Sequence, residues 1–207
     1  MLDKKVILIG YSGHAYVVAD IAIENQFDII GYTEKSRVQN NPFNLNYAGY
    51  EREMDFFENN KEIGFIIGIG DNLIREKIYN LITLNNAKIT TLISNTSSIS
   101  QSAKINSGTF INRNVTINAL AKIGKNVILN TACVIEHDCE ISDSVHIGPG
   151  AVLSGNVFVG QRSFIGANSV VKQGVKIGKD VIVGAGSVVI SDVRDGEKVV
   201  GNPSRYI

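Results

Sequence analysis

Residues 121–153 read AKIGKNVILNTACVIEHDCEISDSVHIGPGAVL, and every sixth residue from Ile123 to Leu153 is aliphatic. The same spacing runs without a break from Ile93 to Val189, which makes 17 consecutive aliphatic positions. The position four residues later is always small or β-branched, and the position directly after the aliphatic residue is often Gly or Asn. A period of six matches neither the 3.6-residue repeat of an α-helix nor the two-residue repeat of a flat strand.

A triangular coil of parallel strands, with one hexad on each side and three hexads per turn, accounts for this period. The aliphatic side chain fills the interior, the small residue fits near a crowded corner, and Gly or Asn tolerates an unusual corner backbone. At ~4.8 Å between strands, roughly five and a half such coils make a prism about 27 Å tall. The repeat therefore predicts a parallel β-helix over residues 93–207.

The first half of the chain has a different pattern, and 11 of the 15 Phe and Tyr residues lie before residue 93. Short apolar runs alternate there with segments that have an apolar stripe at helical spacing. This alternation predicts a small parallel α/β, Rossmann-like domain over residues 1–92. We expect strands at 6–9, 27–32, 65–70 and 89–93, helices at 15–24 and 72–84, and a polar loop at 33–49.

Composition excludes several classes of protein. The formal net charge is zero with a pI near 6.8, so no bulk charge attracts nucleic acid or anionic lipid. No apolar run approaches the ~20 residues of a membrane span, and the run Val6–Ile9 is too short for a signal peptide. Two cysteines without metal-type spacing predict a reducing, cytoplasmic setting and no metal site.

Four motifs occur together: GYSGH at 10–14, IGDN at 69–72, NTACVIEHDC at 130–139 and GNPSR at 201–205. In this combination the chain resembles the hexapeptide-repeat, left-handed β-helix acetyltransferases of bacterial sugar pathways. That group includes sialic acid O-acetyltransferases and the N-acetyltransferases of nucleotide-linked 4-amino-4,6-dideoxy sugars. The turn Ser12-Gly13-His14 favours the second branch. The resemblance implies a left-handed coil, a homotrimer with active sites between subunits, and acetyl-CoA as co-substrate.

His137 is the best candidate for a general base, because an amine must lose a proton to attack a thioester and imidazole titrates near neutral pH. The resemblance assigns Asp138 as the carboxylate that orients the His137 ring, and Glu136 is the alternative. Adjacent residues on a regular strand point to opposite faces. We therefore expect Asp138 to reach His137 only at a corner or through distorted backbone; a solvated surface histidine is the alternative reading.

The other predicted residues of the β-helix concern acetyl-CoA. His146 lies nine residues, or half a coil, beyond His137, so the two meet only if neighbouring subunits contribute one each. The resemblance places His146 at the acetyl-CoA carbonyl and matches Gly155, Ala167 and Ala185 to CoA contacts. A solvated histidine and plain corner residues are the alternative readings. Asn130 is expected to hold either the substrate or His137, with a plain corner residue as an equal alternative.

The turn Gly10-x-x-Gly13 before a helix suits phosphate binding through backbone amides, although a tight strand-to-helix turn has the same sequence. The resemblance makes this a sugar-nucleotide pocket at the carboxyl ends of the strands. Its predicted lining is Ser12, Gly13, His14, Thr33, Glu34 and Gly70. One departure stands out: Tyr32-Thr33-Glu34 replaces the paired acidic residues that relatives often have there.

These observations predict an acetyl-CoA-dependent N-acetyltransferase that acts on a nucleotide-linked 4-amino-4,6-dideoxy sugar. The resemblance implies that the nucleotide is UDP. Cys133 and Cys139 fall on the small inward positions, which favours direct attack over an acyl-cysteine intermediate. Two alternatives stay open: a sialic acid O-acetyltransferase, and a non-catalytic trimeric scaffold in a sugar pathway. A zinc-dependent β-helical carbonic anhydrase needs three histidines in the helix, where this chain has two.

Overall fold

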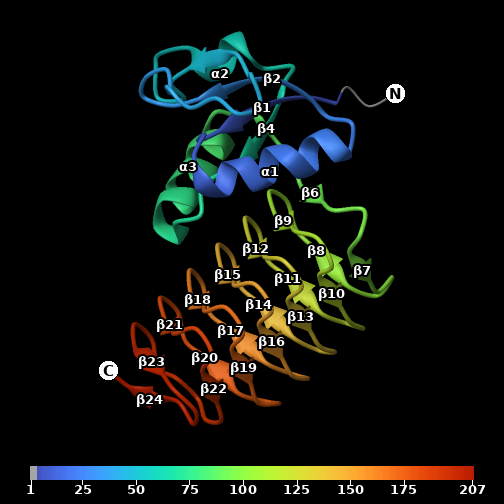
Figure 1. Cartoon of the computed structure of the whole chain (residues 1–207), viewed down its shortest axis with the longest axis vertical. Helices are drawn as coiled ribbons and strands as arrows, with labels where there is room; N and C mark the ends of the chain where they lie inside the picture. Colours follow the sequence, from blue (N-terminus) through green and yellow to red (C-terminus); the bar gives the residue numbers. More distant parts are fainter. Residues whose placement is uncertain (1–3) are drawn as a thin grey trace. The chain divides into compact units, whose positions relative to one another are not determined.

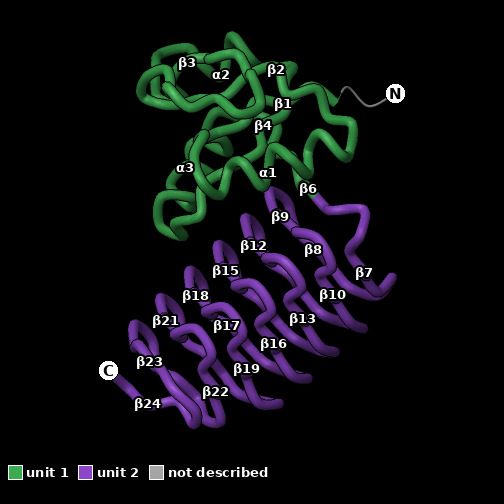
Figure 2. Tube along the Cα trace, viewed as in Figure 1, with its two compact units in different colours: residues 1–92 green, residues 93–207 purple. Residues whose placement is uncertain are grey.

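The computed structural model describes residues 4–207, and the chain divides into two compact units, residues 1–92 and residues 93–207 (Figure 2). Residues 1–3, part of the segment for which no signal peptide is expected, lie outside the described residues. In the described part, no helix is long and apolar enough to span a membrane.

The first unit is built on a five-stranded parallel sheet in the order β3-β2-β1-β4-β5. Helix α1 packs on β1 and β2, and α3 packs on β4 and β5. The core lies between these layers, because β1 and β4 are apolar and buried along almost their whole length. The elements are β1 (Lys5–Ile9), α1 (Gly13–Glu24), β2 (Asp28–Thr33), β3 (Tyr47–Gly49), α2 (Phe56–Asn59), β4 (Gly64–Ile67), α3 (Asn72–Leu84) and β5 (Lys88–Ile89).

Three expectations for this unit are wrong in detail. The segment 33–49 is not all loop, because β3 ends it and pairs in parallel with β2; α2 was not expected. The strand expected at 65–70 ends at Ile67, which leaves residues 68–70 as a loop. The strand expected at 89–93 is divided: β5 belongs to this sheet, and β6 (Leu92–Ile93) starts the β-helix. Short apolar runs do not reveal which sheet they join.

The second unit is a three-sided parallel β-helix whose coils stack from β6 to the C-terminal strands (Figure 1). Strands 18 residues apart pair in parallel, as the repeat predicts. One sheet holds β7 (Ser98–Ile99), β10 (Thr116–Ile117), β13 (Val134–Ile135), β16 (Val152–Leu153), β19 (Val170–Val171) and β22 (Val188–Val189). The second holds β8 (Lys104–Ile105), β11 (Lys122–Ile123), β14 (Glu140–Ile141), β17 (Phe158–Val159) and β20 (Lys176–Ile177). The third holds β6, β9 (Phe110–Ile111), β12 (Ile128–Leu129), β15 (His146–Ile147), β18 (Phe164–Ile165), β21 (Ile182–Val183), β23 (Lys198–Val200) and the antiparallel β24 (Arg205–Tyr206).

The interior of the prism is the column of aliphatic side chains that the period of six predicts. From Ile111 to Val189 each of them is buried, and Ile93, Ile99 and Ile105 are partly buried at the first coils. Burying such a side chain is worth roughly 1.5–3 kcal/mol. This column is therefore the main source of stability for a unit with two-residue strands.

The corners differ from the expectation. The left-handed backbone falls three residues after the aliphatic position, for example at Ala132 (φ +55°) and Asp138 (φ +59°). The glycines directly after the aliphatic residue have ordinary φ values and serve close packing instead. A β-carbon on Gly124 would lie 2.7 Å from the backbone of Ser142 and Asp143 in the next coil. Glycine is needed at that position because the coils stack tightly, not because the chain turns there.

Candidate active site

His137 and Asp138 lie at the corner between β13 and β14, where the structure brings their side chains together. His137 Nδ1 is 2.9 Å from Asp138 Oδ2. The left-handed backbone of Asp138 turns the chain sharply, so neighbouring residues reach each other as they would not on a regular strand. Asp138, and not Glu136, is the carboxylate bonded to the imidazole.

The direction of this bond sets the state of the ring. An ionised carboxylate only accepts hydrogen bonds, so His137 Nδ1 must carry the proton and donate it to Asp138. In the neutral ring the other nitrogen, Nε2, then holds a lone pair. The two side chains are about half exposed, at 52% and 51%. The arrangement is that of an oriented base.

Gly155, predicted as a CoA contact, lies directly beside the His137 ring, 18 residues and one coil further on. The two coils are joined there because the Asn156 amide donates to the His137 carbonyl at 2.8 Å. A β-carbon on Gly155 would lie 2.5 Å from both Cε1 and Nε2 of the imidazole. The ring therefore occupies the space that any side chain at position 155 would need.

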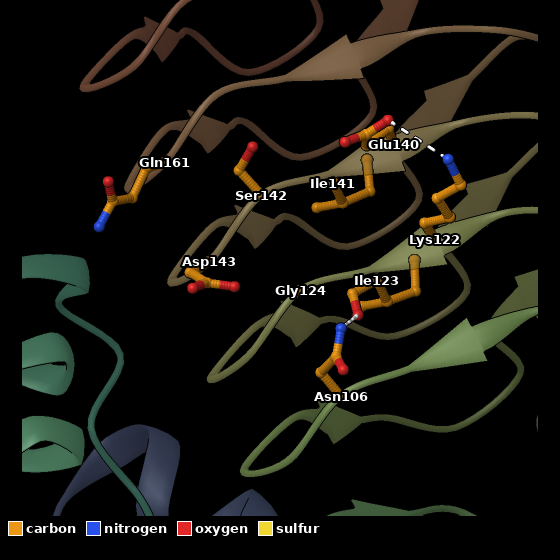
Figure 3. A pocket seen from close by; sticks show the side chains of 9 residues that line it. All are labelled: Asn106, Lys122, Ile123, Gly124, Glu140, Ile141, Ser142, Asp143 and Gln161. Carbon is orange, nitrogen blue, oxygen red and sulfur yellow. Dashed lines mark hydrogen bonds and ion pairs between the residues drawn. The ribbon is translucent and has the colours of Figure 1, made fainter. Parts of the chain in front are cut away.

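Two hollows lie on the face formed by β8, β11, β14, β17 and β20. One, of about 380 Å³, is lined by Asp138 together with Glu140, Asn156, Val157, Phe158, Gly174 and Lys176. The other, of about 430 Å³, contains none of the predicted site residues and is bordered by the Lys122–Glu140 ion pair at 3.8 Å (Figure 3). Glu140 lines both, so the hollow at Asp138 continues along this face.

His146 is on β15, in a different sheet from β13 and β14. Within one chain the two histidines of the β-helix thus occupy separate faces, as their spacing predicts. Asn130 Nδ2 is 3.3 Å from His146 Nε2, so within one chain the Asn130 amide is directed at His146. Ala167 and Ala185 follow strands of the His146 sheet, and the Gly186 amide donates to the Ala167 carbonyl, which stacks them at one corner.

The first unit has a pocket of about 610 Å³ at the carboxyl ends of β1, β2 and β4, where the strand order reverses between β1 and β4. Open parallel sheets bind ligands at such a point. Five predicted residues line it: Ser12, His14, Thr33, Glu34 and Gly70. Gly13, also predicted, is the first residue of α1 and is not among the lining residues.

Three carboxylates line this pocket, those of Glu34, Glu51 and Asp71, and the sequence suggested only Glu34 as a pocket residue. Glu34 accepts a hydrogen bond from the Tyr11 amide at 2.8 Å. Glu51, 7% exposed, accepts one from the Thr33 hydroxyl at 2.9 Å. Glu51 thus supplies the second acidic group that seemed missing beside Glu34. No signal marked it, because it lies 18 residues from Thr33 in a segment without regular periodicity.

His14 lines this pocket, and the buried Arg75 guanidinium lies near it without lining the pocket. Burial, and then the nearby Arg75 charge, lower the pKa of His14 to about 4. Arg75 is 1% exposed and donates to the Gly70 carbonyl and to Asn72 Oδ1, both at 2.9 Å. Burial lowers its pKa to about 9, partly offset by Asp71. At neutral pH a neutral imidazole therefore lines the pocket, and the cation of Arg75 is buried behind it.

The depressed pKa of His14 predicts how stability depends on pH. Because the unfolded chain has the ordinary value of 6.5 and the folded chain about 4, the unfolded state binds more protons between these values. The contribution of His14 is full above pH 6.5 and is lost as the pH falls toward 4. Urea unfolding at about pH 7.5 and about pH 4.5 should show wild type losing about 2–3 kcal/mol more than His14→Gln. Equal losses would contradict the assignment.

Both cysteines are buried free thiols. Burial raises the pKa of Cys133 to about 12 and also raises the pKa of Cys139. Thiols in this state are poor nucleophiles, so their burial does not favour an acyl-cysteine intermediate. Among residues 4–207 no group of three or more His, Cys, Asp or Glu side chains is arranged to hold a metal ion.

Three family models match successive parts of the chain. The model described as the PglD N-terminal domain matches residues 5–82. The model described as bacterial transferase hexapeptide (six repeats) matches residues 120–155, and that described as hexapeptide repeat of succinyl-transferase matches residues 157–191. A comparison with curated protein sequences finds no match.

Solved structures resemble the chain over its whole length. A perosamine N-acetyltransferase from Caulobacter crescentus, with one histidine replaced by asparagine and in complex with CoA and GDP-perosamine, is 29% identical with a TM-score of 0.93, over 98% of this chain and 96% of that chain. The acetyltransferase domain of PglB from Neisseria gonorrhoeae FA1090, in complex with acetyl coenzyme A, is 30% identical with a TM-score of 0.91, over 99% and 100%. WeeI from Acinetobacter baumannii AYE is 26% identical with a TM-score of 0.88, over 98% and 99%.

The fold is thus the left-handed parallel β-helix preceded by a Rossmann-like domain, and its class is that of the hexapeptide-repeat transferases. Within this class the chain belongs to the family of sugar acetyltransferases that carry a PglD-type N-terminal domain. It is an acyltransferase, as the sequence resemblance implied.

Proposed function

We propose that this protein transfers the acetyl group of acetyl-CoA to the amine of a nucleotide-linked 4-amino-4,6-dideoxy sugar, with His137 as the general base. The observation that carries the proposal is the 2.9 Å bond between His137 and Asp138, which leaves Nε2 of the neutral ring as the proton acceptor. Similarity along the whole chain to a perosamine N-acetyltransferase crystallised with CoA and GDP-perosamine supports the choice of donor and acceptor.

The proposed reaction is a direct attack in a ternary complex. The amine nitrogen bonds to the thioester carbonyl carbon, and its proton passes to His137 Nε2. Asp138 stabilises the imidazolium that forms, through the Nδ1 hydrogen bond. The carbon–sulfur bond then breaks, and the CoA thiolate leaves and takes up a proton. The products are the acetamido sugar and free CoA.

We also propose that three chains assemble and that the acetyl-CoA site lies between two of them. In one chain His137, Asp138 and Gly155 meet at one corner, whereas His146, Ala167 and Ala185 follow another sheet. One acetyl-CoA contacts both sets only if adjacent chains each contribute one. Small residues at the stacked corner of Ala167 and Ala185 leave room for an extended pantetheine chain.

The pocket of the first unit is proposed to hold the nucleotide-linked sugar. Ser12 is the N-cap of α1, makes no side-chain capping bond and lines the pocket, so the positive end of this helix suits a phosphate group. Lys35, Arg52 and Lys77 also line the pocket and suit the charge of a diphosphate. UDP is the nucleotide that the sequence resemblance implied, and GDP is the one in the Caulobacter complex. A cytoplasmic setting fits two buried free thiols.

The test is turnover with purified protein, acetyl-CoA and a panel of acceptors, following the release of free thiol. The panel contains 4-amino-4,6-dideoxy sugars linked to UDP or GDP, the same sugars without nucleotide, and sialic acid. Thiol release only with a nucleotide-linked amino sugar, with an N-acetyl product by mass, is the expected result. Release with sialic acid would move the enzyme to O-acetylation, and no release with any acceptor would favour a scaffold.

A further inference from the structure

We propose that Asn112 and Asn130 fix the tautomer of His146, with the proton on Nδ1 and the lone pair on Nε2. The three side chains stand on successive coils, and their hydrogen bonds run in one direction from Asn112 through Asn130 to the imidazole. Their effect on acetyl transfer rests on the proposed function, whereas the tautomer itself does not.

The orientation of the Asn130 amide is set by the backbone. The Thr131 amide donates to Asn130 Oδ1 at 2.8 Å, and only the oxygen of a carboxamide accepts such a bond. The amide nitrogen is therefore on the other side, 3.3 Å from His146 Nε2. Because this nitrogen is a donor without a lone pair to offer, His146 Nε2 must be the acceptor.

Asn112 holds Asn130 from the preceding coil. Its own orientation is set in the same way, because the Arg113 amide donates to Asn112 Oδ1 at 2.7 Å. Its amide nitrogen then donates to Asn130 Oδ1 at 2.8 Å and to the Thr131 hydroxyl at 2.9 Å. Asn112 is 1% exposed, so water does not compete for these bonds. Flipping Asn130 would place its nitrogen against two donors at once, the Thr131 amide and the Asn112 amide nitrogen.

The consequence is a defined role for His146. A proton on Nε2 would set two donors against each other, so the chain of amides favours the neutral ring with Nδ1 as the donor. The Phe164 ring meets the imidazole edge to face, with centroids 5.0 Å apart, and restricts its rotation. A fixed donor suits stabilisation of the oxyanion that forms on the acetyl carbonyl. Asn112 and Asn130 are then positioning residues, not contacts of the sugar.

Nitrogen-15 NMR of protein labelled at histidine tests the tautomer directly. The chain has three histidines, so His→Gln variants at positions 14, 137 and 146 assign every signal. In wild type we expect His146 Nε2 to have the shift of an unprotonated nitrogen and Nδ1 that of a protonated one. Asn130→Asp replaces the donor by an acceptor and should exchange the two shifts. Asn106→Asp, in which the altered amide only meets the Ile123 carbonyl, should leave them unchanged.

Kinetics separate positioning from substrate binding. Asn130→Asp should lower kcat by about 10–100-fold with little change in KM for the sugar nucleotide, because only the donor is lost. A proton on Nε2 of wild-type His146, or shifts that Asn130→Asp does not alter, would overturn the proposal. The wild-type spectrum identifies the tautomer of His146 even if a variant folds poorly. It does not require acetyl transfer, so a protein without activity can still show the predicted tautomer.

Discussion

Replacement of His137 by Ala is expected to lower kcat for acetyl transfer by about 10²–10⁴-fold, the range that a positioned general base contributes. The reason is geometric: Nε2 of His137 holds the lone pair, because Nδ1 donates to Asp138. Without this acceptor the amine must lose its proton to water. KM for acetyl-CoA should change much less, since the ring is not needed to hold the donor. Steady-state kinetics with saturating acceptor measures the effect.

Two aspartates provide the matched control. Asp138→Asn keeps the shape of the corner but removes the carboxylate that orients the imidazole, so kcat should fall by about 10–100-fold. Asp180 occupies the same left-handed position of its hexad, 42 residues later at a different corner of the prism, and there it binds Arg162 at 2.6 and 2.7 Å instead of a histidine. Asp180→Asn should therefore cost some stability and leave kcat within about twofold. Retention of kcat by His137→Ala would remove His137 from the mechanism.

Gly155→Ala is expected to reduce kcat by about 10²-fold, although position 155 carries no reactive group, because displacing a catalytic group by about 1 Å has effects of that size. The added β-carbon would lie 2.5 Å from Nε2 and Cε1 of His137, so the ring must leave its place. The displaced ring is half exposed and can move toward solvent, so the free energy of unfolding should fall by only about 1 kcal/mol, the worth of the lost bond to Asp138.

A double-mutant cycle identifies the cause. In a His137→Ala background no ring occupies the space, so adding Gly155→Ala should cost almost no further stability. The φ angle of Gly155 lies outside the left-handed region, so alanine meets no backbone strain there. The cycle is measured by denaturant unfolding of the four proteins. An equal loss in both backgrounds would show that another neighbour, and not the imidazole, resists the β-carbon.

The β-helix was predictable because one rule repeats along the chain. Each sixth residue points inward, so the aliphatic column and the buried positions of Cys133 and Cys139 follow from spacing alone. The corner geometry was not predictable, because Gly occurs at two positions of the hexad for different reasons. At Gly124 the coils stack tightly, and at Gly150 the backbone is left-handed. A sequence shows the residue type and not which constraint selects it.

Some residues of the candidate site could likewise be predicted from the sequence, and others could not. His137 and Asp138 were identified by resemblance, and the spacing of the two histidines predicted their separate faces. Glu51 and Asn112 escaped notice because their importance comes from contacts across the fold: Glu51 with Thr33, and Asn112 with a residue one coil away. Such contacts depend on three-dimensional register, which no local pattern of residues records.

Subunit mixing distinguishes an active site shared between two chains, as proposed, from one built within a single chain. His137→Ala protein and His146→Ala protein are unfolded together in equal amounts, refolded and assayed for acetyl transfer. In a ring of three chains each site takes His137 from one chain and His146 from its neighbour, so about a quarter of the sites should regain both histidines. Activity well above the average of the two separate preparations is the predicted result. Activity equal to that average would show that each site is built within one chain and would contradict the account.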